Sequence, residues 1–476
     1  MNKKLIYMSL LSATLLLGSC KDEFLEQEPH SSLPIGTAIK TADDLQAAAN
    51  GMYSSMRSFE SFGRNIPILG DLLADNIYIS VQNRGSYAQQ NSFTTIVTAA
   101  EATEMWRTLY TTILRANTII HADVPSSPAV NQLKGEALAV RALCHLELVK
   151  FFAQPYTVNP NGLGVPVVTE FNAGNPTNYY ASFQPKRNTV AEVYTQIHSD
   201  FSQAYGLMTV NKNSSYITKY AAKALQARAY LYMGDYVNAR EAALDVVNNG
   251  KFTLVSAANY VAYWANPVPV SNKVETIFEI SYDAVNNQGT NALAYFYDQA
   301  GYGDMLATDD LYNSYESTEE RTDVRKNVIK VGTRADVPAN IVTKYSNTSN
   351  GTEKDDVKVI RYAEVLLTLA EAYAKTGDEA NALLTLNKVT AARNATPYAS
   401  SGSQLVEDII TERRKELAFE GHRYYDFMRL NRVVKRTTQH PAAAREIDVT
   451  NYRRIQPIPQ GELDANPNIE PNPGYQ

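Results

Sequence analysis

Most of the chain after residue 40 shows the hydrophobic periodicity of amphipathic helices. Apolar residues recur three and four positions apart, so they fall on one face of a helix with 3.6 residues per turn. Over residues 101–123 this spacing predicts one long helix whose apolar face comprises Met105, Leu109, Ile113, Ala116 and Ile120. The same periodicity in other segments predicts a mainly α-helical fold.

Capping residues mark the starts of further helices. A Ser or Thr side chain at the N-cap accepts a hydrogen bond from the first turn, and an acidic residue three positions later can return one. Proline is favoured at the first helical position. These signals predict helices that begin after Thr41 with Asp44, after Ser127 with Pro128, and after Thr189 with Glu192. The second and third are expected to extend to Phe152 and Leu207.

Two segments repeat one another. Residues 227–239, ARAYLYMGDYVNA, and residues 370–382, AEAYAKTGDEANA, share Ala-x-Ala-Tyr-x-x-x-Gly-Asp and a later Ala. This pattern is typical of a tetratricopeptide hairpin, in which small residues let two helices approach closely and Gly-Asp forms the turn. Because one hairpin cannot bury its apolar face alone, the repeats are expected to stack on neighbouring helices.

A different pattern separates the two repeats. Apolar and polar residues alternate through Val274, Thr276, Phe278, Ile280 and Tyr282, which predicts a β-strand. Polar and glycine-rich connections surround it, and long connections in a compact helical protein are usually functional or disordered. We therefore expect loop insertions near residues 76–95, 159–187 and 251–356.

The first twenty residues have the pattern of a secretory signal. A pair of lysines precedes a short apolar run that ends in Gly-Ser-Cys at Cys20, and charged residues follow at once. The run is shorter than the roughly 20 apolar residues of a transmembrane helix. Its end resembles the lipobox of bacterial lipoproteins, which implies a signal peptide over residues 1–19, lipid on Cys20 and a tether over residues 20–40. The alternative is an internal helix that contains a cysteine.

Composition narrows the class of function. The chain has 44 Lys and Arg against 50 Asp and Glu, a net charge of −6, which argues against an electrostatic nucleic-acid binder. Its two cysteines are Cys20 and Cys144, so acylation of the first leaves no intramolecular disulfide, and Cys144 is expected to be buried. The 31 tyrosines supply rings with a polar tip, which suit wet binding surfaces.

Several longer motifs together resemble one family. They lie at residues 135–156, 164–168, 187–201, 362–389, 409–430 and 457–475, and IITERRKELAFEGHRYYDFMRL at 409–430 is the most specific. Over nearly its full length the chain resembles the SusD/RagB family of outer-membrane nutrient-binding lipoproteins, partners of SusC-like TonB-dependent transporters. The resemblance implies a single SusD-like domain over residues 41–476. That domain is a superhelix of tetratricopeptide-like hairpins with long loop insertions and a few short strands, and it sits like a lid over the transporter.

Candidate ligand contacts lie in the insertions, because loops held by a rigid scaffold carry specificity. A sugar ring has apolar C–H faces and a polar rim, so it requires an aromatic platform with hydrogen-bonding groups beside it. The residues that fit these roles are Tyr78, Asn83, Arg84, Tyr87, Trp264, Tyr295, Tyr297 and Tyr302. The alternative is that these rings fill gaps between the loops and the scaffold.

The charged residues within 409–430 favour a structural role. They recur at helical spacing and can form ion pairs that fix helix docking. The basic cluster at 413–415 is flanked by Glu412 and Glu416, and it is expected to form a solvated helix face.

The sequence contains none of three common catalytic signatures, namely Gly-x-Ser-x-Gly, His-Glu-x-x-His and the phosphate-binding Gly-x-x-x-x-Gly-Lys. His145 and His422 lie inside helical patterns and are expected to be scaffold residues. Carboxylates such as Asp71 and Asp75 could in principle form a glycosidase pair, but nothing selects one pair. We expect a protein without enzymatic activity, cofactor or metal.

These observations predict a lipid-anchored outer-membrane protein that faces the cell exterior. We expect it to bind oligosaccharide by stacking and hydrogen bonding and to deliver it to a SusC-like transporter. A peptide is the alternative ligand. Two rival functions stay open, a helical glycoside hydrolase and a structural tetratricopeptide adaptor without a small ligand.

Overall fold

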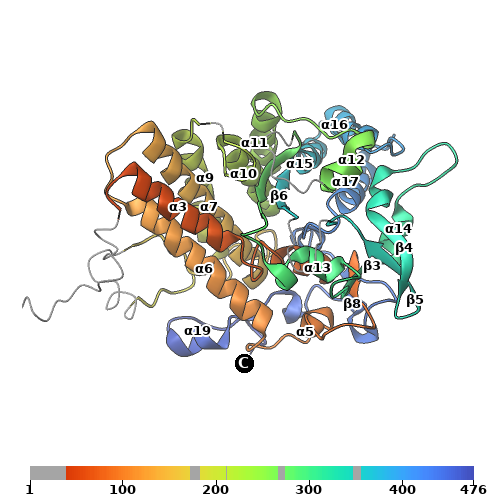
Figure 1. The fold of residues 1–476 in the computed structure, drawn as a ribbon, viewed down its shortest axis with the longest axis horizontal. Helices are drawn as coiled ribbons and strands as arrows, with labels where there is room; N and C mark the ends of the chain where they lie inside the picture. The colour runs from red at the N-terminus through yellow and green to blue at the C-terminus, as the bar shows by residue number, and fades with distance from the viewer. Residues whose placement is uncertain (1–38, 172–182, 211, 266–273, 347–354, 476) are drawn as a thin grey trace, which may run out of the picture.

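A computed structural model describes residues 39–171, 183–210, 212–265, 274–346 and 355–475. The predicted signal peptide, Cys20 and nearly all of the predicted tether lie outside these residues, as do parts of the second and third insertions. In Figure 1 the long helices extend along the left and top of the molecule, β3, β4, β5 and β8 lie on the right near α14, and β6 lies near the centre beside the helices.

The long helices pack one against the next in a row. They are α3 (Ala42–Met56), α6 (Ala100–His121), α7 (Pro128–Phe152), α9 (Val190–Leu207), α10 (Lys219–Met233), α11 (Tyr236–Asn249), α15 (Tyr362–Lys375), α16 (Glu379–Ala392) and α17 (Gly402–Glu416). Contacts run from α3 through α6, α7, α9, α10 and α11 to α15, which packs against both α16 and α17. Such a row is the arrangement of stacked helical hairpins. The predicted mainly α-helical, tetratricopeptide-like fold is therefore confirmed.

Three helix starts agree with their capping signals. At α3 and at α9 both halves of the capping box form, between Thr41 and Asp44 and between Thr189 and Glu192. At α7 the Ser127 hydroxyl accepts the backbone N–H of the third helical residue at 3.2 Å. These bonds satisfy N–H groups that have no partner inside the helix.

The repeated segments form the hairpins α10–α11 and α15–α16. Gly234 and Gly377 adopt φ values of 74° and 86°, a left-handed conformation that glycine adopts without steric cost. The aspartate that follows each glycine caps the next helix, since Asp235 accepts the Asn238 N–H and Asp378 the Asn381 N–H. The Gly-Asp pair thus ends one helix and starts the next in both repeats.

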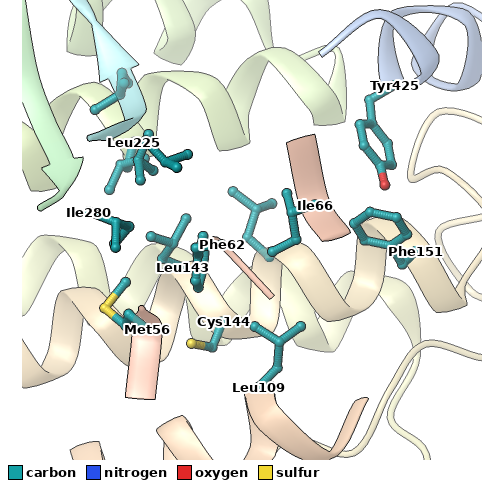
Figure 2. Packing of buried hydrophobic residues seen from close by; sticks show 14 of the residues in the cluster. Met56, Phe62, Ile66, Leu109, Leu143, Cys144, Phe151, Leu225, Ile280 and Tyr425 are labelled. Carbon is teal, nitrogen blue, oxygen red and sulfur yellow. The ribbon is translucent and has the colours of Figure 1, made fainter. Parts of the chain in front are cut away.

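The hydrophobic core is continuous between the helices and the strands. Figure 2 shows Leu143 and Cys144 of α7 among Leu109 of α6, Leu225 of α10 and Ile280 of β2, all of which are buried. Cys144 is buried as predicted, and burial raises the pKa of its thiol well above the ordinary value.

The strands form small antiparallel sheets. One sheet has the order β1 (Ile77–Ile79), β3 (Met305–Ala307), β5 (Val337–Val342), β4 (Ile329–Arg334). The others pair β2 (Thr276–Ile280) with β6 (Val357–Arg361) and β7 (Val434–Lys435) with β8 (Glu446–Ile447). The strand predicted around residue 278 is therefore present, but every residue of β2 is buried, so both of its faces pack against protein.

Short helices connect these elements. They are α4 (Asn65–Leu72), α5 (Ala88–Asn91), α12 (Tyr260–Trp264), α13 (Leu293–Tyr297), α14 (Asp309–Ser314), α18 (Arg423–Arg429) and α19 (Gln460–Ala465). Single turns of 3₁₀ helix lie at Ala257–Asn259, Gly289–Asn291, Val324–Val328, Ala442–Ala444 and Tyr452–Arg454.

The charged motif within 409–430 is buried, so the expectation of a solvated helix face was wrong. Glu412, Arg413 and Glu416 are fully buried, because α17 packs against α15, α16 and α18. The predicted ion pairs are confirmed. Arg361 at the end of β6 is their centre, and its guanidinium donates to three carboxylates, those of Glu275, Glu416 and Glu420.

A second arginine binds two of the same carboxylates. Arg393, the C-cap of α16, donates to Glu275 at 2.8 Å and to Glu416 at 2.9 Å. Lys344 donates to Glu420 at 2.7 Å. We call this set, Glu275, Lys344, Arg361, Arg393, Glu416 and Glu420, the ion network. It joins the β2–β6 sheet to the ends of α16 and α17, and its three cations match its three anions.

Candidate ligand-binding site

The loop after β1 is held in place by its own side chains. The Ser80 N–H donates to the Asp304 carbonyl at 2.8 Å, which extends the β1–β3 pairing by one residue. The Asn83 amide donates to the Ser80 carbonyl at 2.6 Å and accepts the Gly85 N–H at 2.7 Å. Because such Asx turns fix a loop locally, the loop holds Arg84 at a defined position.

Two tyrosines from α13 and the turn after it meet this loop. The Tyr302 N–H donates to the Tyr295 carbonyl at 2.9 Å, and their rings meet edge to face with centroids 4.6 Å apart. The Arg84 guanidinium lies over the Tyr302 ring, 3.6 Å from its centroid. Both tyrosines are half-buried and Arg84 is exposed. A guanidinium stacked on a ring keeps its in-plane N–H donors for hydrogen bonds.

The sheet brings a second arginine to the same place. Arg334, the last residue of β4, donates to the carbonyls of Tyr302 at 2.5 Å and Gln82 at 3.3 Å. Gly303 has φ of 56°, and a Cβ there would lie 3.0 Å from the Arg334 guanidinium and 2.9 Å from the Gln299 amide nitrogen. This glycine therefore lets Arg334 and Gln299 close around the turn.

Several polar atoms around this turn are buried without hydrogen bonds among the described residues. They are both carboxylate oxygens of Asp304, Oε1 of Gln299 and Nε of Arg334. Burial raises the pKa of Asp304, and the nearby Arg84 backbone N–H and the two guanidiniums offset only part of that effect. Unsatisfied buried polar atoms are uncommon in folded proteins, and a ligand that supplies the missing partners would explain them. We call Arg84, Tyr295, Gln299, Tyr302, Asp304 and Arg334 the tyrosine site.

Three of the residues proposed from the sequence meet at this site. Arg84, Tyr295 and Tyr302 converge there, and the Asn83 side chain lies beside them but is used by its own turn. Sequence reasoning missed the polar members. Gln299 lies between Tyr297 and Tyr302 and Asp304 lies two residues after Tyr302, so their proximity in the sequence was a usable signal. No such signal was present for Arg334, because only the β-sheet brings it to the turn at residues 302–304.

The other proposed rings are buried and pack beneath the loops. The Tyr87 hydroxyl donates to Asn65 at 2.5 Å, and Tyr297 stacks on Tyr345. Trp264 lies under Lys344, whose ammonium is 4.1 Å from the ring, and Tyr78 is largely buried on β1. These four residues fit the interpretation in which rings fill the gap between loop and scaffold. A ligand on the surface does not reach them in this structure.

The carboxylates considered for a glycosidase pair are bound within the protein. Asp71 accepts hydrogen bonds from the Asn76 amide at 2.6 Å and from the Gly421 N–H at 2.8 Å, and burial raises its pKa to about 7. Burial also acts to raise the pKa of Asp75, but the guanidiniums of Arg423 and Arg414 lower it overall. Both carboxylates therefore help to hold α4 and the turn after it against the region around α18.

The two histidines singled out from the sequence are buried in the scaffold. Burial lowers the pKa of His145 to about 3, and its Nδ1 lies 3.1 Å from the Arg141 carbonyl. Within the described part of the chain, no three His, Cys, Asp or Glu residues are grouped as a metal site would require. The helices found in that part are too short or too polar to cross a bilayer.

Two family models match the chain. The model described as "SusD family" matches residues 337–475, and the model described as "Starch-binding associating with outer membrane" matches residues 23–231. SusD-like protein P2 of Formosa agariphila is 26% identical over 99% of both chains.

Solved structures are similar over almost the whole chain. A putative sugar binding protein from Bacteroides vulgatus is 30% identical with a TM-score of 0.82, over 92% of this chain and 100% of that one. A SusD superfamily protein from the same species is 28% identical with a TM-score of 0.83, at the same coverage.

Proposed function

Because this chain belongs to the SusD family, we propose that it is a lipid-anchored protein of the outer-membrane surface that binds oligosaccharide and delivers it to a SusC-like TonB-dependent transporter. A carbohydrate ligand is supported by the starch-binding description of one family model and by the sugar-binding description of the 30% identical structure. The lipid anchor is supported by the Gly-Ser-Cys sequence that ends at Cys20.

The tyrosine site is the observation that carries the proposal. Half-buried Tyr295 and Tyr302 offer ring surface for the C–H face of a pyranose, and Arg84 adds N–H donors at the rim of that surface. Gln299 Oε1 and the Asp304 carboxylate supply buried acceptors that make no well-formed hydrogen bond within the described residues, although the Arg84 backbone N–H lies near the carboxylate. A sugar hydroxyl can both donate and accept, so it can satisfy these acceptors and the arginine donors together.

Binding at this site needs no chemical step. Ring stacking and hydrogen bonds are reversible, and a ligand to be passed on must also leave. The protein would therefore act by capture and release, with the rigid Asx-turn loop holding Arg84 in place before the ligand arrives.

Calorimetry with a panel of neutral and acidic oligosaccharides tests the proposal. Tyr295→Ala and Tyr302→Ala should each weaken binding of the best ligand at least tenfold, about 1.4 kcal/mol, since each removes a stacking surface. Tyr312→Ala is the matched control, because that ring is also half-buried beneath a cation, with Lys326 at 4.5 Å, but lies on α14. Unchanged affinity in both site variants would refute the site.

The same samples separate carbohydrate binding from its rivals. Retention of peptides but of no glycan would replace the carbohydrate ligand with a peptide. New reducing ends in the glycan samples would indicate a hydrolase. The anchor has its own test, since mass spectrometry of exported protein should find acyl groups on Cys20, and Cys20→Ser should release the protein from membranes. An unmodified Cys20 on a membrane-free protein would refute the anchor.

A further inference from the structure

A groove away from the tyrosine site has apolar walls and a buried arginine. Its volume is about 440 Å³, and it lies between the loop after α7, the end of α18 and the C-terminal segments around residues 450 and 473. We call it the C-terminal groove. Its lining includes Val158, Leu163, Met428, Val449, Arg454 and Ile455. A volume of this size is that of a small-molecule pocket, for which roughly 300–1,000 Å³ is usual.

The apolar side chains in this groove include three that are partly open to water. Val158 is 42% exposed, and Leu163 and Val449 are each 37% exposed. They come from segments nearly 300 residues apart in sequence, and all line one concave surface. Single exposed apolar residues need no explanation, but several that converge in one groove indicate a surface for an apolar partner group.

Arg454 is a charged group inside this apolar groove. The residue is buried, with only 6% of its surface exposed. One terminal nitrogen donates to the Arg432 carbonyl at 3.0 Å and the other reaches the Asn431 side chain at 3.5 Å. The Tyr424 side chain also interacts with this guanidinium, and Nε has no hydrogen-bond partner among the described residues. No carboxylate of the described chain forms an ion pair with it. The charge of Arg454 helps to lower the pKa of Asp448, but the Asp448 side chain is exposed and accepts hydrogen bonds from the N–H and hydroxyl of Thr450.

A second buried arginine shows what a structural role requires. Arg436 is 7% exposed and also has no carboxylate partner among the described residues. Its guanidinium nevertheless donates to five acceptors, the carbonyls of Leu72, Ala74, Asn91 and Ala444 and the Asn91 side chain. Arg436 is thus saturated by the fold. Arg454 has fewer and longer bonds and lines an open groove. Its Nε is closed to water, so the terminal nitrogens are the donors for an incoming anion.

We propose that the C-terminal groove binds a small amphipathic carboxylate. The apolar body lies on Val158, Leu163 and Met428, and the carboxylate pairs with the terminal nitrogens of Arg454. A planar guanidinium matches a carboxylate with two parallel hydrogen bonds, and such a pair is strongest where water is excluded. This site is separate from the tyrosine site and does not depend on the function proposed for it.

Octanoate is the probe that tests this proposal in the intact purified protein. Calorimetry should show octanoate binding at least tenfold more tightly than 1-octanol, octylammonium or acetate, because only octanoate combines an apolar body with a carboxylate. If 1-octanol bound as tightly as octanoate, the carboxylate would not pair with Arg454 and the proposal would be overturned. Absence of octanoate binding, or binding only of acidic peptides, would overturn the proposal.

Variants locate the binding in the groove. Val158→Glu places a competing carboxylate there at an exposed position, and it should reduce octanoate affinity at least tenfold. Val331→Glu is the matched control, because Val331 is 60% exposed on β4, and it should leave that affinity unchanged. Arg454→Gln should abolish the preference for octanoate over 1-octanol.

Oligosaccharide binding at the tyrosine site provides the internal reference. It should be the same in all three variants, so that a failure of this inference is distinct from a failure of the proposed function. If Arg454→Gln fails to fold, Val158→Glu still decides the matter. Unaltered octanoate affinity in folded Val158→Glu would overturn the assignment to this groove.

Discussion

The ion network and the tyrosine site use the same kinds of side chain in opposite ways. In the ion network every nitrogen of the Arg361 guanidinium donates to an oxygen, and the neighbouring indole of Trp264 is sealed from water. In the tyrosine site Asp304 and Arg334 keep polar atoms without partners among the described residues, and the ring of Tyr302 is half-exposed. The two clusters therefore differ less in residue type than in how fully their carboxylates and guanidiniums are paired. Unpaired buried atoms also occur among the described residues of the scaffold, at Trp264 Nε1 and in the Arg413 guanidinium, so the half-exposed ring of Tyr302 is needed to distinguish the site.

The two clusters also move carboxyl pKa values in opposite directions. Burial acts to raise the pKa of Glu416, but the guanidiniums of Arg393 and Arg361 lower it well below the usual value. Burial raises the pKa of Asp304, because the charges around it compensate less. The ionised Glu416 carboxylate therefore stabilises the folded protein. The ionised Asp304 carboxylate is destabilised by burial, and a ligand that donates hydrogen bonds to it would offset that cost.

Breaking the ion network should have the largest effect. Arg361→Met leaves Glu275, Glu416 and Glu420 short of a counter-charge inside the protein, and removal of one partner of a buried ion pair costs about 3–5 kcal/mol. Urea unfolding should show this loss of stability. Arg432→Met is the matched control, since it removes an exposed pair with Glu407 and should cost less than about 1 kcal/mol. Equal losses in the two variants would contradict the comparison.

The raised pKa of Asp71 predicts that the stability of the protein depends on pH. Its folded-state pKa of about 7 lies above the ordinary value of 3.8, so the folded protein holds a proton that the unfolded chain releases. Its contribution is complete below about pH 4 and is lost as the pH rises through 7, by up to about 4 kcal/mol at 1.36 kcal/mol per unit.

Thermal unfolding from pH 4 to 8 measures this slope. Asp71→Asn cannot ionise, so its stability should vary less with pH over that range than that of the natural chain. Parallel curves for the two proteins would refute the assignment. The lowered pKa of Glu416 acts in the opposite sense, and its contribution is lost only in acid, as the pH falls below about 4.5.

Asp304→Asn sharpens the comparison within the tyrosine site. The substitution keeps the shape of the side chain and removes a buried charge that the fold compensates poorly, so stability should be equal or higher. Oligosaccharide affinity should fall about tenfold, since hydrogen bonds to charged groups are worth about 1.5–3 kcal/mol. Glu416→Gln should instead lower stability. Urea unfolding and calorimetry measure both variants. An equal loss of stability in Asp304→Asn and Glu416→Gln would contradict this contrast.

Asn83→Ala should have the smallest effect. It removes two hydrogen bonds of the exposed turn, so the loss of stability should be about 1 kcal/mol or less. Affinity for oligosaccharide should fall a few-fold, because Arg84 is no longer held over Tyr302 before binding. Calorimetry against the same ligand checks this, and Asn83→Asp, which keeps the acceptor for Gly85, should lose less. An effect on affinity larger than that of Tyr302→Ala would show that Asn83 touches the ligand itself.

Helices and hairpin turns could be predicted from the sequence because their causes are local. The Thr189–Glu192 capping box and the Gly234–Asp235 turn act within four residues, so the printed order of residues contains the interaction. The ion pairs of 409–430 were also expected from their spacing. Their partners outside the segment were not, because Arg361 at the end of β6 and Glu275 directly before β2 are distant in sequence.

The binding residues show the same division. The sequence by itself determined the stacked-hairpin scaffold, the burial of Cys144 and the presence of tyrosines in the insertions. Only the tertiary structure decided that Tyr295 and Tyr302 stay at the surface while Tyr87 and Tyr297 are covered. The physical reason is that a ring reaches water or not according to which segments pack over it, and those packing contacts join residues that the sequence keeps far apart.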